Sequence, residues 1–268
     1  MASNQPDPEL YASPTFRFRV GVEAEEFKIH SLALTRLSDY FDALMNNGMQ
    51  ESTQGIANWE DVDREAFLRF CQFAYTNDYE EPLPVAREPD ASNSNETGNQ
   101  IKLVEMEGVN AEKQIRSIRS YLSDMHRGSA NNHLSTISPH DETIDISPIL
   151  RCHVALYILA DRCLVEPLRK LALRKLHADL SSWTYGSESI REMAYIVIYA
   201  YSWTLDNDRI RAILATFVAA HKTWYIDRPE DEEDQAIIRE FQADVKRVVD
   251  MFAEPEPKRM GEMFRLRP

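Results

Sequence analysis

An alternation of apolar and polar residues near the N-terminus limits what this chain of 268 residues can fold into more than any other feature. Between Phe16 and Val22, apolar side chains occupy every second position. A period of two places them on one face of a β-strand. The polar run Glu23–Glu26 predicts a turn, after which Phe27 and Ile29 resume the alternation. The sequence therefore predicts a β-hairpin with one buried face.

Helical spacing replaces the alternation after Ser31. Leu34, Leu37 and Phe41 recur at intervals of three and four residues and predict helices at about 31–37 and 38–47. Ser38 is suited to cap the second of them, because its hydroxyl can bond a free amide.

A third strand and a longer helix follow this pair. The strand is expected near Ile56–Trp59, and the helix at about Asp63, whose carboxylate suits an N-cap. We expect a core that contains Phe27, Phe41 and Phe67, with Tyr157 joining it from a later segment.

The composition changes at residues 82–148, which are rich in Pro, Ser, Asn, Glu and Gly. Such a segment has too few apolar residues to offset the entropy of ordering, so we expect a largely disordered insertion. Within it, Ala111–Met125 has apolar residues at helical spacing. This stretch is either a weakly packed surface helix, which we favour, or a helix that docks on a partner.

Helical patterns resume after the insertion. Residues 149–180 predict a helical hairpin with Leu159–Arg162 before its turn, and 181–253 predict an all-helical extension. The extension has helices at Ser187–Trp203, Asp208–Trp224 and Asp234–Phe252. The flanks are a proline-containing arm at 1–15, expected to be disordered, and a tail at 254–268. Because the tail is basic and apolar in an acidic chain, it is expected to pair with the chain's own surface or with a partner, and we favour the first.

Charge, hydropathy and cysteine content bound the function. The formal charge of -14, from 30 basic and 44 acidic residues, disfavours nucleic acid as a partner. Since the N-terminus lacks the features of a targeting signal and no stretch is apolar enough to span a bilayer, we expect an intracellular chain in the cytoplasm or nucleus and no membrane partner. The three cysteines lie in apolar helical contexts and indicate reduced, buried thiols.

Motifs for catalysis or cofactor binding are sparse. The eight glycines match neither a dinucleotide-binding loop nor a phosphate-binding loop. Cys152, His153 and Cys163 would point in different directions on a helix, so we predict no metal site. His30, between a strand and a helix, is interpreted as a structural residue that bonds backbone groups. The sequence therefore predicts no catalytic residue, no metal and no cofactor, and no enzyme.

The order of these elements resembles the BTB/POZ domain, and is most similar to its fungal-type members. The resemblance rests on Val20–His30, Met49–Ser52, Ala74–Thr76 and Leu159–Arg162. It implies an α+β fold, a small sheet with flanking helices, over residues 16–180, interrupted by the insertion and followed by the helical extension. It also implies a protein-interaction function.

Within this resemblance, Met49 and Glu51 are the expected partner-binding residues. BTB proteins that recruit the cullin-three ubiquitin-ligase scaffold have a hydrophobic residue, any residue and then Glu after the second helix of the fold, which Met49-Gln50-Glu51 matches. A solvated turn is the alternative interpretation. Ser31 and Arg17 depart from the family pattern, and 1–15 lacks the elements that many members exchange in homodimers.

The resulting hypothesis is a substrate adaptor for a cullin-three ubiquitin ligase. No substrate-reading repeat or zinc finger accompanies the domain in this sequence. One alternative is a self-associating scaffold or regulatory protein without a ligase role. The other is a small-molecule enzyme in the helical half, which would need a polar pocket with shifted ionisation.

Overall fold

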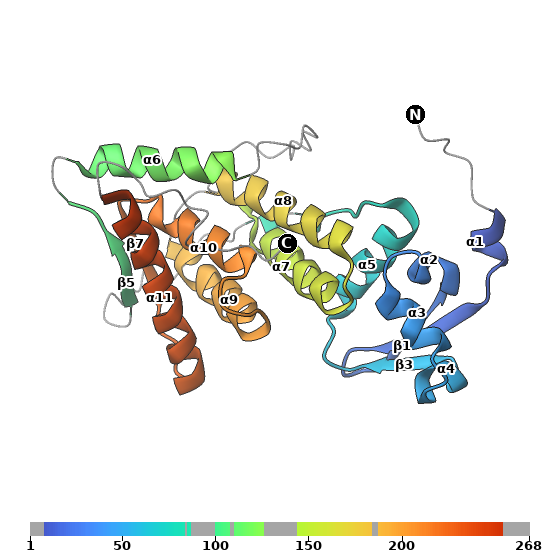
Figure 1. Cartoon of the computed structure of the whole chain (residues 1–268). Helices are drawn as coiled ribbons and strands as arrows, with labels where there is room; N and C mark the ends of the chain where they lie inside the picture. Colours follow the sequence, from blue (N-terminus) through green and yellow to red (C-terminus); the bar gives the residue numbers. More distant parts are fainter. Residues whose placement is uncertain are drawn as a thin grey trace. The chain divides into compact units, whose positions relative to one another are not determined.

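The chain is described by a computed structural model, in which residues 8–83, 85–86, 100–107, 110–125, 144–183 and 187–253 are placed. These residues divide into two compact units. The first contains those up to Pro82 and Ala155–Leu173; the second contains Leu83–Val154 and those from Arg174 onward. Figure 1 shows the helices and strands of both units, with labels where there is room. Residues 1–7 of the expected arm and the whole tail at 254–268 lie outside the described residues.

The predicted hairpin forms the sheet of the first unit. Strand β1 (Thr15–Val20) pairs antiparallel with β2 (Glu25–His30), and β3 (Ile56–Trp59) pairs parallel with β1, giving the order β2-β1-β3. Alternation along β1 buries its apolar side chains as predicted. Val22 does not continue that face, because the strand ends at Val20 and the turn leaves Val22 94% exposed.

Aromatic rings fill the core of this unit. The ring of Phe18, from β1, lies 4.9 Å from that of Trp59 and 5.2 Å from that of Phe67, centre to centre. Phe41, Phe67 and Tyr157 are buried as predicted. Phe27 is only half-buried: its ring contacts Phe67 at the border of the core, 5.2 Å away.

Helices precede, separate and follow the strands in the N-terminal part of the first unit. They are α1 (Pro8–Ala12), α2 (Ser31–Thr35), α3 (Asp39–Asn46), α4 (Gln50–Gln54) and α5 (Arg64–Thr76). Asp63 caps α5 as predicted and accepts from the Ala66 amide at 2.8 Å. Ser38 precedes α3, but its hydroxyl makes no cap and instead donates to the Cys163 carbonyl. Helix α1 shows that the expected disordered arm does not extend through all of 1–15.

The helical hairpin after the insertion consists of α7 (Ser147–Arg162) and α8 (Glu166–Ser182). Its turn contains Leu164 with φ of 55°, a left-handed conformation that is unusual for a branched apolar residue. The helical spacing of apolar residues was sufficient to predict both helices from the sequence. Among the described residues, no helix combines the length and apolar character needed to cross a membrane.

The second unit contains the three helices predicted for the extension. They are α9 (Ser187–Trp203), α10 (Arg209–Ala219) and α11 (Glu232–Ala253). The extension is not all-helical, however, because β7 (Thr223–Asp227) follows α10. Residues 220–224 were expected to continue the helix, but α10 ends near Ala220 and the chain becomes extended.

Part of the expected disordered insertion is ordered in this unit. Strand β5 (Gln100–Glu105) pairs antiparallel with β7, with Ile101 opposite Ile226. Helix α6 (Ala111–Asp124) lies against α10 and α11 and buries Ile115, Ile118 and Leu122 (Figure 1). Two short strands, β4 (Val85–Ala86) and β6 (Ile144–Asp145), also pair. The predicted amphipathic helix therefore exists, but as a core element, and the composition of the surrounding segment concealed it.

Candidate protein-interaction site

Met49 stands exposed at the start of α4. Its side chain is 64% exposed, while its backbone is fixed on both sides. The Met49 amide donates to Asn47 Oδ1 at 2.9 Å, and its carbonyl accepts from the hydroxyls of Ser52 and Thr53 at 2.9 Å each. The sequence thus places a flexible apolar side chain on a rigid loop, a combination suited to a partner surface.

Gly48 makes this exposure possible. Its φ of 78° is in the left-handed region, where a Cβ would be strained, and the bend separates α3 from α4. Helix α4 then ends at Gly55, which is also left-handed with φ of 63°. The triplet Met49-Gln50-Glu51 therefore begins a separate five-residue helix that was not predicted, with Met49 as its N-cap residue.

Glu51 is less exposed than Met49. It lies in the first turn of α4, where a carboxylate is favoured by the free amides, and its side chain is half-buried rather than fully exposed. Burial raises the pKa of the neighbouring Tyr40 phenol. Cys163 and Glu51 raise this pKa further, and Arg162 lowers it. Tyr40 therefore lies within electrostatic range of both Glu51 and Arg162.

Arg162 provides the basic part of this surface. It donates to Asp61 Oδ2 at 2.6 Å and its guanidinium lies over the Trp59 ring, 5.4 Å from the centre. Leu164, two residues later, is 68% exposed. We call Tyr40, Met49, Glu51 and Arg162 the Met49 surface, because Tyr40 interacts with both Glu51 and Arg162. Only Met49 and Glu51 were expected from sequence, because the rest reach this face through tertiary folding.

His30 has the structural role that was expected, with a side-chain partner. It ends β2, and its amide donates to the Tyr75 hydroxyl at 3.0 Å while its Nδ1 lies 2.9 Å from the same oxygen. The Tyr11 ring packs edge-on against the imidazole, 5.8 Å away. These contacts fix the junction of β2 and α2.

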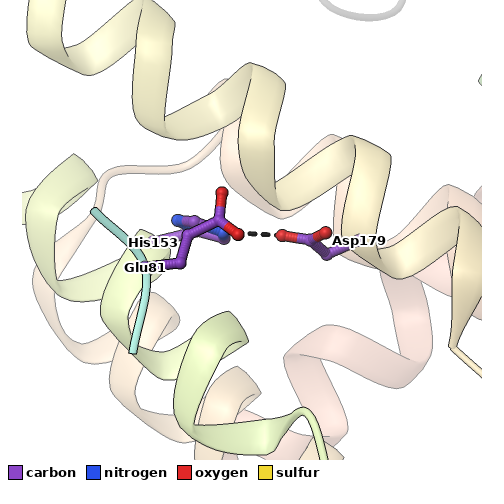
Figure 2. Close-up of side chains that lie close together, drawn as sticks. All are labelled: Glu81, His153 and Asp179. Carbon is purple, nitrogen blue, oxygen red and sulfur yellow. Dashed lines mark hydrogen bonds and ion pairs between the residues drawn. The ribbon is translucent and has the colours of Figure 1, made fainter. Parts of the chain in front are cut away.

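The residues weighed as a metal or nucleophile cluster have other environments. His153 is buried, and its Nε2 lies 2.7 Å from Asp179 Oδ2, joining α7 to α8 (Figure 2). Burial raises the pKa of the Cys163 thiol to about 12, so that it is not a thiolate at neutral pH. All three cysteines are free thiols. Asp179, the partner of His153, was not identified from sequence, since the two are 26 positions apart.

Ionisable groups with shifted pKa values in the second unit serve the packing of its helices. Burial lowers the pKa of His177, whose Nε2 bonds the Leu122 carbonyl at 2.8 Å. It likewise lowers the pKa of His221, whose ring bonds the Phe217 carbonyl. Burial, with Asp244 nearby, raises the pKa of Tyr201. His177 thus bonds a residue of α6 and Tyr201 bonds Asp244 of α11, whereas His221 bonds a carbonyl of α10, the helix that it follows.

Comparison with known proteins identifies the first unit. The sequence model of the BTB/POZ domain family matches residues 17–92. The matched segment contains β1 from Arg17 onward, β2, β3 and α2 to α5, including Met49 and Glu51. The small sheet with flanking helices is the fold expected from the sequence.

Curated relatives match over a shorter stretch. Kelch-like protein 17 of mouse and of human are each 40% identical to this chain over 55 residues, which is 20% of this chain. The alignment spans 9% of the length of each relative. The chain therefore spans only a small part of the length of these relatives.

Proposed function

We propose, from the BTB/POZ domain at residues 17–92, that this protein is a substrate adaptor that binds the cullin-three ubiquitin-ligase scaffold through its Met49 surface. BTB/POZ domains are protein-interaction folds, and the adaptor would act inside the cell, in the cytoplasm or nucleus. The second unit would hold the substrate. A similarity to fungal-type members remains a prediction.

The observation that carries this proposal is the exposure of Met49 on a fixed backbone. Met49 is 64% exposed, Glu51 follows it by two residues, and Tyr40 interacts with both Glu51 and the basic Arg162. An exposed apolar side chain with such neighbours in the same surface has the composition of an interface centre. Met adapts to a partner groove, and Glu51 can accept charge-assisted bonds from a basic neighbour.

Calorimetry with the purified N-terminal region of cullin-three tests the proposal. We expect a heat of binding at tens of micromolar protein. Replacing Met49→Ala together with Glu51→Lys should abolish it, because hot-spot residues typically contribute about 2 kcal/mol or more each. The reversed charge should also repel a basic partner. Circular dichroism of the variant should match that of the parent.

The β1–β2 turn offers a matched control. Val22→Ala with Glu23→Lys likewise truncates an exposed apolar side chain and reverses the charge of a neighbouring Glu in the same unit. This variant should bind as the parent does. If the unmodified chain gives no heat of binding, the adaptor proposal is wrong. A scaffold or regulatory BTB protein, including a homodimer, then becomes the better hypothesis. An equal loss of binding in both variants would show that binding does not use the Met49 surface.

A further inference from the structure

Helix α9 presents an aromatic face to solvent. Tyr195, Tyr199 and Trp203 follow one another at intervals of four residues, which places them along one side of the helix. Their exposed fractions are 58%, 37% and 52%. From Tyr195 to Trp203 the helix carries no charged residue, although charged residues make up 28% of the chain. We call these three residues the α9 aromatic face.

This face is distinct from the side that packs α9 into its unit. The opposite side buries Met193, Val197 and Ala200, and the helix contacts α10, α11 and β7. The α9 aromatic face is therefore additional to the apolar surface that folding requires. Leu205, just beyond the end of α9, is also 84% exposed. Exposed Tyr and Trp gathered in this way are typical of an interaction surface.

A segment of the same chain has complementary chemistry. Between Lys258 and Arg267 the sequence has four basic residues and one acidic residue. Between these charges lie Met260, Met263, Phe264 and Leu266. Arg side chains stack favourably on Tyr and Trp rings, and Met and Phe pack against them. The structure already contains one such pair, since Arg151 lies over the Tyr195 ring, 5.3 Å from its centre.

Acidic groups near the face add charge complementarity. Asp206 follows Trp203 by three residues, and its side chain is 84% exposed although Arg211 lies 3.3 Å away. At the other end of the face, Glu192 pairs with Arg151. An Arg-containing segment laid along the face would therefore find an accessible carboxylate at the Trp203 end.

The segment is tethered within reach. Helix α11 packs along α9, where the Tyr201 hydroxyl donates to Asp244 at 2.9 Å. The end of α11 at Ala253 is nine residues beyond Asp244, or about 14 Å at the helical rise. The following residues, 254–268, can extend to roughly 50 Å. Because a short tether gives an effective concentration in the millimolar range, even a weak contact would be occupied.

We propose that residues 258–267 dock in cis on the α9 aromatic face, with arginine side chains stacked on its rings. This intramolecular contact is independent of the Met49 surface. The contact gives residues 258–267, a basic and apolar segment, a role that the proposed binding to cullin-three does not need.

Tryptophan fluorescence gives a direct test. Trp59, Trp183 and Trp224 are buried in the structure, so the 52% exposed Trp203 dominates quenching by acrylamide. Truncation after Ala253 should raise the quenching constant by at least about twofold, because a docked segment excludes small molecules much as an interface excludes water. A synthetic peptide of residues 254–268 should reverse the rise. In a Trp203→Phe background, truncation should change quenching little.

A variant of the full chain guards against an effect of truncation on folding. Arg265→Glu with Arg267→Glu should reproduce the rise in quenching. The control Lys113→Glu with Arg116→Glu makes the same charge change on the exposed side of α6 and should leave quenching as in the parent. Equal quenching of the full and truncated chains would overturn the proposal. So would protection of Trp203 that disappears on dilution, since that identifies a second copy as the occupant.

Discussion

The Ser38 hydroxyl donates a hydrogen bond of 2.7 Å to the carbonyl of Cys163. The two residues are 125 positions apart, and the bond joins the start of α3 to the residue that follows α7. Cys163 is buried, and its carbonyl is where the helical hairpin turns. A bond between the N-terminal segment and the hairpin therefore helps to close the first unit.

Ser38→Ala should destabilise the first unit by about 1 to 3 kcal/mol, because it leaves the Cys163 carbonyl without this donor. Urea unfolding followed by circular dichroism measures the change. Ser117→Ala on α6 is the control: its hydroxyl bonds the Lys113 carbonyl on an exposed helical surface, so the loss should be within about 0.5 kcal/mol. Equal effects would mean that the long-range bond adds nothing.

Phe41→Ala should cost about 3 to 5 kcal/mol of unfolding free energy, because the side chain is fully buried and its removal leaves a cavity. Its ring lies 5.6 Å from that of Phe70 and 6.3 Å from that of Trp59. Thermal or urea unfolding should show the loss, with Val22→Ala, in the exposed turn, unchanged. A variant that unfolds like the parent would contradict the packing of α3.

Arg211→Ala should destabilise the second unit by about 1 to 3 kcal/mol. The Arg211 side chain is buried and bonds the Tyr201 carbonyl at 2.9 Å and Glu240 at 2.6 Å. Its loss leaves the buried carbonyl without this donor, whereas the Glu240 side chain is 44% exposed and can be solvated. Arg211→Lys should recover only part of the loss, because an ammonium cannot reproduce the planar set of donors. Lys246→Ala, which breaks an exposed pair with Asp250, should cost less than about 1 kcal/mol.

Stability should fall as pH rises above about 9, in part through Cys163. Burial raises the pKa of this thiol from 9.0 to about 12 in the folded state. Between these values the unfolded chain releases the proton while the folded chain retains it, so the unfolded state gains. The slope is up to about 1.4 kcal/mol per pH unit for one such group. Urea unfolding at several pH values should show a shallower slope for Cys163→Ala than for the parent; identical slopes would contradict the burial of the thiol.

Local periodicity determined most of the elements. Alternation from Phe16 predicted β1 and β2, and helical spacing predicted α7, α9 and α11, because each pattern reports which side of an element is buried. The Asp63 cap was equally predictable, since its partner is the Ala66 amide three residues away. Met49 and Glu51 were predicted as partner-binding residues through the family resemblance, and the structure places them at the start of α4.

Only the tertiary structure decided which elements are partners. Strands β5 and β7 are separated by about 120 positions, and nothing in Gln100–Glu105 specifies that its partner is Thr223–Asp227. A run such as Ile101–Met106 has the apolar content of a strand, but the polar residues around it favoured disorder. Likewise, the amphipathic pattern of α6 shows that one face is apolar and leaves open whether water, a partner or α10 covers it. Sequence encodes burial locally, whereas pairing and docking depend on the free energy of contacts made after distant segments have come together.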